Sequence, residues 1–225
     1  MLTPVSRNIF SWSTPDPEAF WLMVGHLVLS EGSAILVDPP NVPGLVESVK
    51  RLAKPDAIIL TTGDHLRGTD YLAGEFSAQV YLPKQEDSDI DEGTAMRIRR
   101  MKNVKFFDEG DDLPLGVRSF RARVDRGKSA PNLNEMLLLT NTGELLAGDI
   151  AMGSADGGLI TRNEFFSRSG APDPDDNSIC FMTIRKVVER SGARSLLASH
   201  GFDVLDNLQH ALEVRIAQYS RIRSS

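Results

Sequence analysis

The stretch Asp56-Ala57-Ile58-Ile59-Leu60-Thr61-Thr62-Gly63-Asp64-His65 places an acidic residue and a histidine directly after a short apolar run. The run is partly β-branched and is bounded by a proline and a glycine, which favours a buried strand over residues 56–61. In mixed α/β folds, active-site residues gather on the loops that follow such strands. Asp64 and His65 are therefore candidate functional residues.

Two further expected strands end in the same kind of side chain. Leu146-Ala147-Gly148-Asp149 and Leu197-Ala198-Ser199-His200-Gly201 each carry an apolar run followed by Asp or His beside a glycine. Together with Asp64 and His65 they supply two carboxylates and two imidazoles, which suffice to hold one divalent ion with water completing its coordination. Zn²⁺, Mn²⁺ and Fe²⁺ all suit these ligands.

The same residues also admit a purely structural interpretation. A strand-end Asp often caps the next helix by accepting hydrogen bonds from backbone N–H groups. Asp64 could cap the turn that leads to a helix at residues 71–76, and Asp149 could close a loop. His200 could be a buried imidazole whose hydrogen bonds are satisfied. The residues alone leave both interpretations open.

Strands and helices are mixed along the chain, which indicates an α+β fold. Two hairpins are expected, the second around the turn Asn141-Thr142-Gly143. The sequence contains neither G-x-G-x-x-G nor G-x-x-x-x-G-K-[ST], so it predicts no nucleotide-binding loop of these kinds. Strands are expected at residues 20–29, 34–37, 56–61, 79–82, 104–107, 117–124, 135–139, 144–147 and 195–198, and helices at 43–52, 71–76, 96–101, 179–188 and 205–222.

Composition narrows the functional classes. The 225 residues contain 25 Lys and Arg against 31 Asp and Glu, a net charge of −6 that argues against nucleic-acid binding. The lone cysteine, Cys180, excludes a disulfide framework and a zinc site built from thiolates. No apolar run approaches the roughly 18 residues of a membrane span, and no signal peptide is recognised. We expect a cytoplasmic protein with a small-molecule partner and no membrane partner; self-association into a homo-oligomer stays open.

The order Asp64-His65, Asp149, His200 resembles the metallo-β-lactamase superfamily. The signature of that family is H-x-H-x-D-H after a strand, then a later His, a Gly-Asp and a final His. The segment Ala34-Ile35-Leu36-Val37-Asp38 also resembles an early strand of the family that ends in Asp. The resemblance extends from about residue 20 to residue 201. It implies an αββα sandwich of two mixed sheets flanked by helices, as a single domain over residues 1–225.

The departures from the signature imply a reduced metal site. The two leading histidines of H-x-H-x-D-H fall on Leu60 and Thr62, and the middle histidine falls near Lys128. The ligands of the first metal position are therefore missing. The second position looks complete, with Asp64, His65 and His200 as ligands and Asp149 matching the bridging carboxylate of the family. The resemblance thus implies one divalent ion at most, or none.

Lys128 could compensate for a missing ion. Asp64 and Asp149 would be close together and under-neutralised, which is unfavourable for like charges in a cleft. A Lys128 ammonium at the empty position would offset that charge and could stabilise negative charge on a substrate oxygen. In the alternative interpretation, Lys128 is a solvated side chain in a loop before Pro131.

The leading functional hypothesis is a metal-dependent hydrolase with at most one ion. Asp64, His65, Asp149 and His200 would hold the ion, and Asp64 or Asp149 would orient the attacking hydroxide. The substrate would be an ester, lactone, thioester or phosphoester. Two alternatives stay open: a non-catalytic ligand- or partner-binding relative that has lost its metal site, and a metal-free enzyme in which Lys128 replaces the ion.

Overall fold

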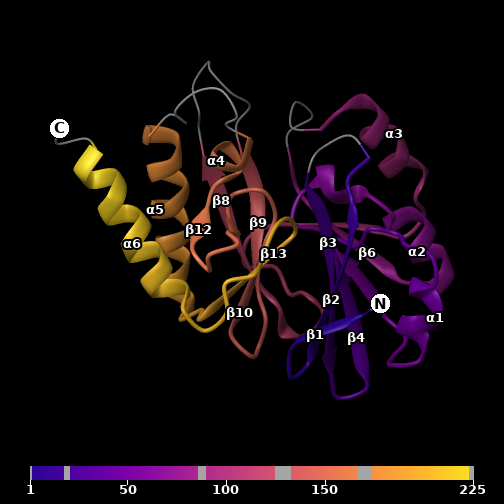
Figure 1. Cartoon of the computed structure of the whole chain (residues 1–225). Coiled ribbons are helices and arrows are strands. Elements are labelled where there is room, and N and C mark those ends of the chain that lie inside the picture. Colours follow the sequence, from indigo (N-terminus) through magenta and orange to yellow (C-terminus); the bar gives the residue numbers. More distant parts are fainter. Residues whose placement is uncertain (1, 18–20, 86–89, 125–132, 167–173, 223–225) are drawn as a thin grey trace. The chain divides into compact units, whose positions relative to one another are not determined.

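The computed structural model describes residues 2–17, 21–85, 90–124, 133–166 and 174–222. The chain forms two compact units, Met1–Val117 (unit 1) and Arg118–Ser225 (unit 2), shown in Figure 1. The prediction of a single domain over residues 1–225 stays a prediction. No helix in the described ranges is both long enough and apolar enough to span a membrane.

The described part of unit 1 is built on one seven-stranded mixed sheet in which the strands follow their order along the chain. The first four strands are antiparallel neighbours, and the last four are parallel neighbours. The strands are β1 (Thr3–Ser6), β2 (Ile9–Pro15), β3 (Leu22–Ser30), β4 (Ser33–Val37), β5 (Ala57–Ile59), β6 (Gln79–Pro83) and β7 (Val104–Phe107).

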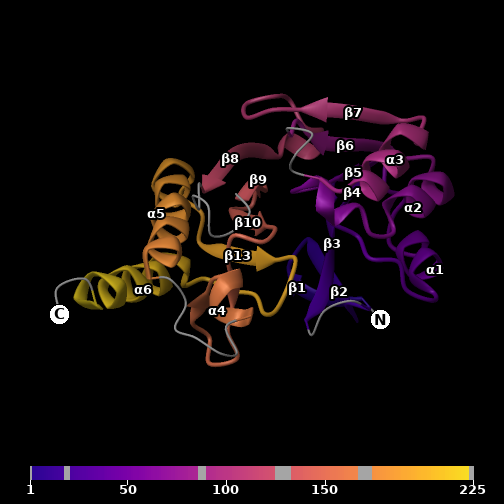
Figure 2. The same cartoon turned by 90° about the horizontal axis from the view of Figure 1, so that it is seen from above.

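Helices connect the parallel strands of unit 1, because parallel neighbours need a crossover rather than a tight turn. They are α1 (Leu45–Lys50), α2 (Thr69–Phe76) and α3 (Glu92–Arg100), which lie on one face of the sheet (Figures 1 and 2). Short 3₁₀ segments occupy Gly63–Leu66 and Pro114–Gly116. Between sheet and helices lies an apolar core that includes Leu36, Ile58, Val80, Val49, Leu72 and Phe76.

The described part of unit 2 contains a four-stranded mixed sheet in the order β13-β10-β9-β8 and a small two-stranded sheet. Helix α5 packs against β8 and against α6. The four strands are β8 (Arg118–Val124), β9 (Leu133–Leu139), β10 (Glu144–Ala147) and β13 (Ser195–Ala198), and the small sheet is β11 (Met152–Gly153) with β12 (Leu159–Ile160). The helices are α4 (Arg162–Phe166), α5 (Pro174–Ser191) and α6 (Leu208–Ile222).

The predicted class, two mixed sheets with helices, is confirmed, and both predicted hairpins form. Some boundaries differ. Helix α3 begins at Glu92 rather than residue 96, because the Asp91 side chain accepts the Thr94 N–H at 3.0 Å and caps the helix earlier. The last helix begins at Leu208 rather than residue 205, after Asp206 adopts a left-handed φ of 54°.

Candidate functional site

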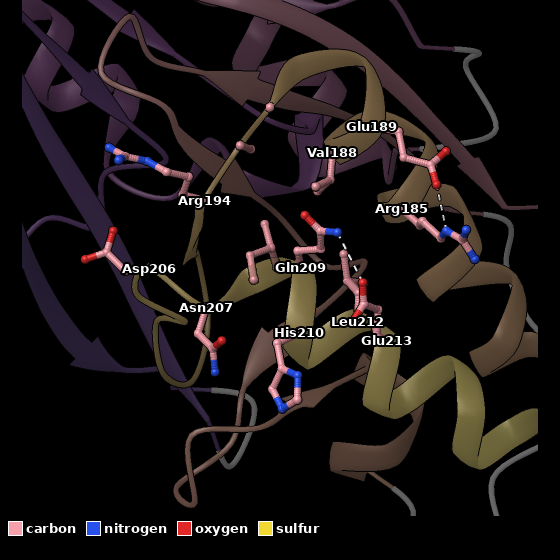
Figure 3. Close-up of a pocket in the computed structure, with 13 residues that line it drawn as sticks. Arg185, Val188, Glu189, Arg194, Asp206, Asn207, Gln209, His210, Leu212 and Glu213 are labelled. Atoms are coloured by element: carbon pink, nitrogen blue, oxygen red, sulfur yellow. Dashed lines mark hydrogen bonds and ion pairs between the residues drawn. The ribbon is translucent and has the colours of Figure 1, made fainter.

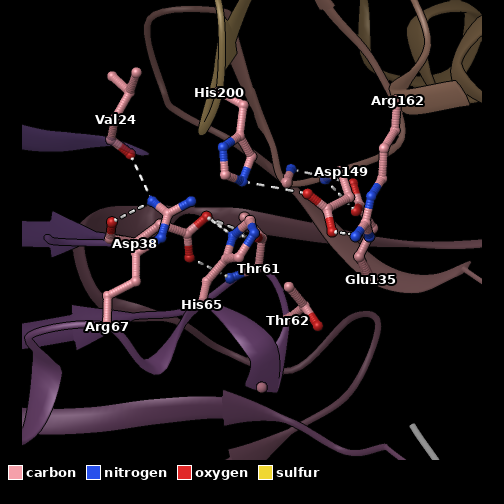
Figure 4. A network of polar contacts seen from close by, with 12 residues as sticks. Val24, Asp38, Thr61, Thr62, His65, Arg67, Glu135, Asp149, Arg162 and His200 are labelled. Carbon is pink, nitrogen blue, oxygen red and sulfur yellow. Dashed lines mark hydrogen bonds and ion pairs between the residues drawn. The ribbon is translucent and has the colours of Figure 1, made fainter. Parts of the chain in front are cut away.

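In unit 1 the predicted residue His65 is held by a buried carboxylate at the end of β4. Asp38 is fully buried, and its Oδ2 lies 2.9 Å from His65 Nδ1 (Figure 4). Asp38 Oδ1 accepts the Thr61 N–H at 2.8 Å, and Oδ2 accepts the Thr61 hydroxyl at 2.6 Å. A carboxylate on Nδ1 fixes the ring and its tautomer, which is how metal-binding histidines are commonly oriented to present Nε2.

The side chain of Arg67, two residues after His65, forms hydrogen bonds to the ends of two strands. Its Nη1 donates to the carbonyl oxygens of Val24 and Asp38, both at 2.9 Å. The Arg67 carbonyl accepts a 2.6 Å hydrogen bond from Arg97 of α3. Asp38 and Arg67 both have positive φ values, 45° and 38°, which non-glycine residues seldom adopt. Such backbone strain persists only where surrounding contacts hold it, and these hydrogen bonds are the contacts that do so here.

Asp64 differs from the buried residues Asp38 and His65 in its exposure. Its side chain is exposed and lines a cavity of about 670 Å³ in unit 1. The same cavity is lined by Asp91, Arg67 and Arg97, so its walls carry both signs of charge. Asp64 and His65 are sequence neighbours, yet one faces solvent and the other is buried.

In unit 2 the structure brings Asp149 and His200 together. Strands β10 and β13 are parallel neighbours with Ala147 opposite Ala198, so the residues just beyond them leave the sheet at the same edge. His200 Nε2 lies 3.3 Å from Asp149 Oδ1, and both side chains are buried (Figure 4). Arg162 of α4 donates from Nη1 to the other carboxylate oxygen, Asp149 Oδ2, at 2.8 Å.

Glu135 fixes the backbone of the Asp149 loop. This residue of β9 is buried, and its carboxylate accepts the N–H groups of Gly148 at 3.1 Å and Asp149 at 2.6 Å. Charge-assisted hydrogen bonds of this kind are stronger than neutral ones. The Asp149 carboxylate is therefore held from both sides, at its backbone by Glu135 and at its side chain by Arg162.

The structure thus brings the predicted residues Asp149 and His200 into contact, and their roles as metal ligands stay a prediction. Lys128 lies outside the described residues. The prediction that Asp64 and His65 share an ion with Asp149 and His200 stays a prediction. Four residues that support the candidate ligands were not identified from the sequence: Thr61, Arg67, Glu135 and Arg162.

The donor atoms of unit 2 fit a divalent ion. Two ligands bound at about 2.0–2.2 Å in a tetrahedral sphere are separated by roughly 3.4 Å. The 3.3 Å between His200 Nε2 and Asp149 Oδ1 matches that separation. An imidazole and a carboxylate are also the ligand types that Zn²⁺, Mn²⁺ and Fe²⁺ accept. This pair can therefore supply two ligands to one ion.

A second cavity, of about 570 Å³, lies in unit 2 where α5 ends and α6 begins (Figure 3). Its exposed walls carry the pair Arg185–Glu189 at 2.7 Å and the pair Gln209–Glu213 at 3.1 Å. His210 also lines it, but none of the predicted site residues does. The Asp149–His200 cluster, rather than this cavity, therefore contains the site residues that the sequence predicts in unit 2.

No protein-family model and no curated protein matches the chain. Solved structures do match it along nearly its whole length. The DIM-1 metallo-β-lactamase is 14% identical, with a TM-score of 0.65 and 97% of each chain covered. The FIM-1 metallo-β-lactamase from Pseudomonas aeruginosa, solved in its mono-zinc form, is 12% identical, with a TM-score of 0.63 over 99% of this chain and 95% of that one. An archaeal metallo-β-lactamase superfamily protein from Sulfolobus tokodaii is 15% identical, with a TM-score of 0.64 over 95% and 86%. The chain has the metallo-β-lactamase fold, and the resemblance that its motifs suggest is confirmed at the level of the fold.

Proposed function

We propose that the chain is a metal-dependent hydrolase with a mononuclear site that includes Asp149 and His200. The observation that carries this proposal is the buried contact of 3.3 Å between His200 Nε2 and Asp149 Oδ1 at the ends of two parallel strands. When bound, a divalent ion would lower the pKa of a water ligand towards about 7 and polarise the carbonyl or phosphoryl oxygen of the substrate. The mono-zinc form of FIM-1 is a precedent for one ion on this fold.

The remaining roles are proposed from the order of the motifs. Asp64 and His65 would complete the ligand set, with Asp38 holding the His65 ring by its Nδ1. Asp149 or Asp64 would orient the attacking water, and Lys128 would offset the negative charge. The proposed substrate is a small ester, lactone, thioester or phosphoester, and the proposed location is the cytoplasm.

A second candidate function is a non-catalytic binding protein of the same fold. Leu60 and Thr62 occupy the positions of the two leading histidines of the signature. Arg162 already neutralises Asp149 Oδ2 through a 2.8 Å contact. Both features are expected of a site whose metal affinity has declined.

Metal analysis of the purified protein separates the two functions. Protein purified without chelator and dialysed against Zn²⁺, Mn²⁺ or Fe²⁺ should hold close to one ion per chain. His200→Ala should weaken ion binding by roughly tenfold or more, because it removes a nitrogen ligand. The matched control is His210→Ala, which removes an exposed histidine of α6 and should leave binding unchanged.

Three results would contradict the hydrolase proposal or its ligand assignment. A protein that holds almost no metal after dialysis against each of the three ions would exclude the metal-dependent mechanism. A loaded protein that turns over none of a panel of esters, lactones, thioesters and phosphoesters would favour the binding protein instead. Full retention of the ion by His200→Ala would show that the ligands are assigned incorrectly.

A further inference from the structure

Arg162 is the cation that the described part of unit 2 places directly on the Asp149 carboxylate. Its Nη1 lies 2.8 Å from Oδ2, while His200 Nε2 lies 3.3 Å from Oδ1. The two carboxylate oxygens thus have different partners, a guanidinium on one and an imidazole on the other. The Asp149 side chain is only 8% exposed, whereas the Arg162 side chain is 39% exposed, so solvent screens this charge pair in part.

The position of Arg162 is set by a buried polar network behind α4. Thr161 precedes it in the chain, donates its N–H to Glu164 at 2.8 Å and donates its hydroxyl to Asn177 at 2.5 Å. Asn177 donates to the Tyr219 hydroxyl at 3.2 Å, which donates to Glu164 at 2.5 Å. Thr161 and Asn177 are fully buried. A satisfied buried network is rigid, so α5 and α6 hold the segment that carries Arg162 in place.

We propose that Arg162 serves as a built-in cation that compensates the charge of Asp149, occupying Oδ2 and leaving Oδ1, beside His200, for one divalent ion. This inference rests on the proposed function. It gives a physical reason for a single ion: half of the Asp149 carboxylate is already committed to a fixed positive charge. Arg suits this role because its guanidinium stays protonated at all relevant pH values.

The proposal predicts the sign of a change in metal affinity. A guanidinium and a divalent ion that share one carboxylate repel each other. Charges about 4–6 Å apart that solvent screens in part change a binding equilibrium by up to roughly tenfold. Removing the charge of Arg162 should therefore tighten ion binding, whereas removing a ligand would weaken it. The opposite signs distinguish a charge-compensating residue from a ligand-orienting one.

The test measures Zn²⁺ affinity in competition with a chromophoric chelator, for the full chain and three variants. Arg162→Gln removes the charge and should bind Zn²⁺ up to about tenfold more tightly than the unmodified chain. Arg162→Lys keeps the charge and should stay within roughly threefold of it. Arg185→Gln is the matched control, since Arg185 pairs with Glu189 on the exposed face of α5, and it should have no effect. Circular dichroism of each variant checks that it is folded.

Each outcome decides between this inference and the proposed function. If the unmodified chain binds Zn²⁺ and Arg162→Gln binds it equally or more weakly, the inference is overturned and the hydrolase proposal stands. If only Arg162→Gln binds Zn²⁺, the inference is supported and the unmodified chain is not a zinc enzyme. If neither binds the ion, both are overturned.

Discussion

Two buried carboxylates, Asp38 and Glu135, hold the loops that carry the candidate ligands. Asp38 accepts hydrogen bonds from the backbone and hydroxyl of Thr61 and contacts His65 Nδ1. Glu135 accepts two backbone N–H groups at the Asp149 loop. Beyond the end of a strand, a backbone N–H group no longer has a carbonyl partner in the sheet. In both cases an acidic side chain accepts the hydrogen bond instead, so that the buried N–H donors stay paired.

The role of Asp38 is tested by Asp38→Asn. The substitution keeps the size of the side chain, but it replaces one acceptor oxygen by an NH₂ group that faces donors or the His65 ring. We expect a loss of about 1–3 kcal/mol in the free energy of unfolding, measured by urea denaturation at pH 7. Asp56→Asn is the control, because Asp56 is exposed. Equal stability of the two variants would show that Asp38 does not hold this loop.

The sequence shows the strand-end positions of the candidate ligands more directly than it shows the residues that support them. Asp149 and His200 follow apolar strands directly, so their place at strand ends could be read from the chain. The partners of Asp38 cannot be read in this way, since Thr61 lies 23 residues away and the two meet only through the pairing of β4 with β5. Glu135 did leave a signal, as the one charged residue of its apolar strand.

At the scale of elements, helices α2 and α3 are joined by an ion pair between Asp70 and Arg97. Arg97 Nη2 lies 2.9 Å from Asp70 Oδ1, and its Nε lies 3.2 Å from Oδ2. Partial burial raises the pKa of Asp70, but the hydrogen bond and charge of Arg97 and the Tyr71 N–H together lower it by more. The pKa of Asp70 in the folded protein is therefore below its ordinary value of 3.8.

This pKa shift predicts a pH-dependent contribution to stability. A lowered folded-state pKa stabilises the fold above the unfolded-state pKa of about 3.9, and the contribution is lost as the pH falls through the folded value. Asp70→Asn should therefore cost roughly 0.2–1 kcal/mol at pH 7, a modest value because both side chains are about two-fifths exposed. The difference from the unmodified chain should shrink as the pH is lowered below 4. Urea denaturation between pH 7 and a pH below 4 measures this difference in unfolding free energy, with the exposed Asp112→Asn as control. A difference that does not change with pH would contradict the lowered pKa of Asp70.

Elements with a clear hydrophobic period were predicted, and those without one were not. Strand β4 and helix α5 correspond to strong apolar patterns. Strands β1 and β2 were missed, because their segments are rich in Ser, Thr and Pro. They are strands because β2 pairs with β3 and β1 pairs with β2. Helix α4 was missed because five residues are too few to show a helical period.

At the scale of the whole molecule, the order of a few motifs identified a fold that sequence identity does not reveal. The three structures compared above share only 12–15% of their residues with this chain. This chain alternates strands and helices, and its own acids and histidines stand at the ends of strands. The reason is physical: many apolar residues can fill a core of given volume, whereas few residue types can serve at a polar strand end.

Each unit also buries apolar residues of its own. We therefore expect each unit to owe part of its free energy of unfolding to its own core. In unit 1, Leu36 is fully buried within the core between the sheet and its helices. In unit 2, Leu137 is fully buried and pairs with Phe120 on the neighbouring strand. The Phe120 ring contacts the Arg190 guanidinium of α5. Because cross-strand partners share a face of the sheet, Leu137 lies on the face that the helix covers. Leu36→Ala and Leu137→Ala are therefore chemically matched core substitutions, one in each unit.

We expect each of these substitutions to cost about 2–5 kcal/mol in the unit that contains it. Native-state hydrogen exchange measures the effect amide by amide, because cooperative units open with their own free energies. Leu36→Ala should reduce protection most in β4, β5 and β6, and Leu137→Ala most in β8, β9 and β10. If either substitution reduced protection equally in both sheets, the chain would unfold as one cooperative body. Each cavity would then lower the opening free energy of every strand by the same amount.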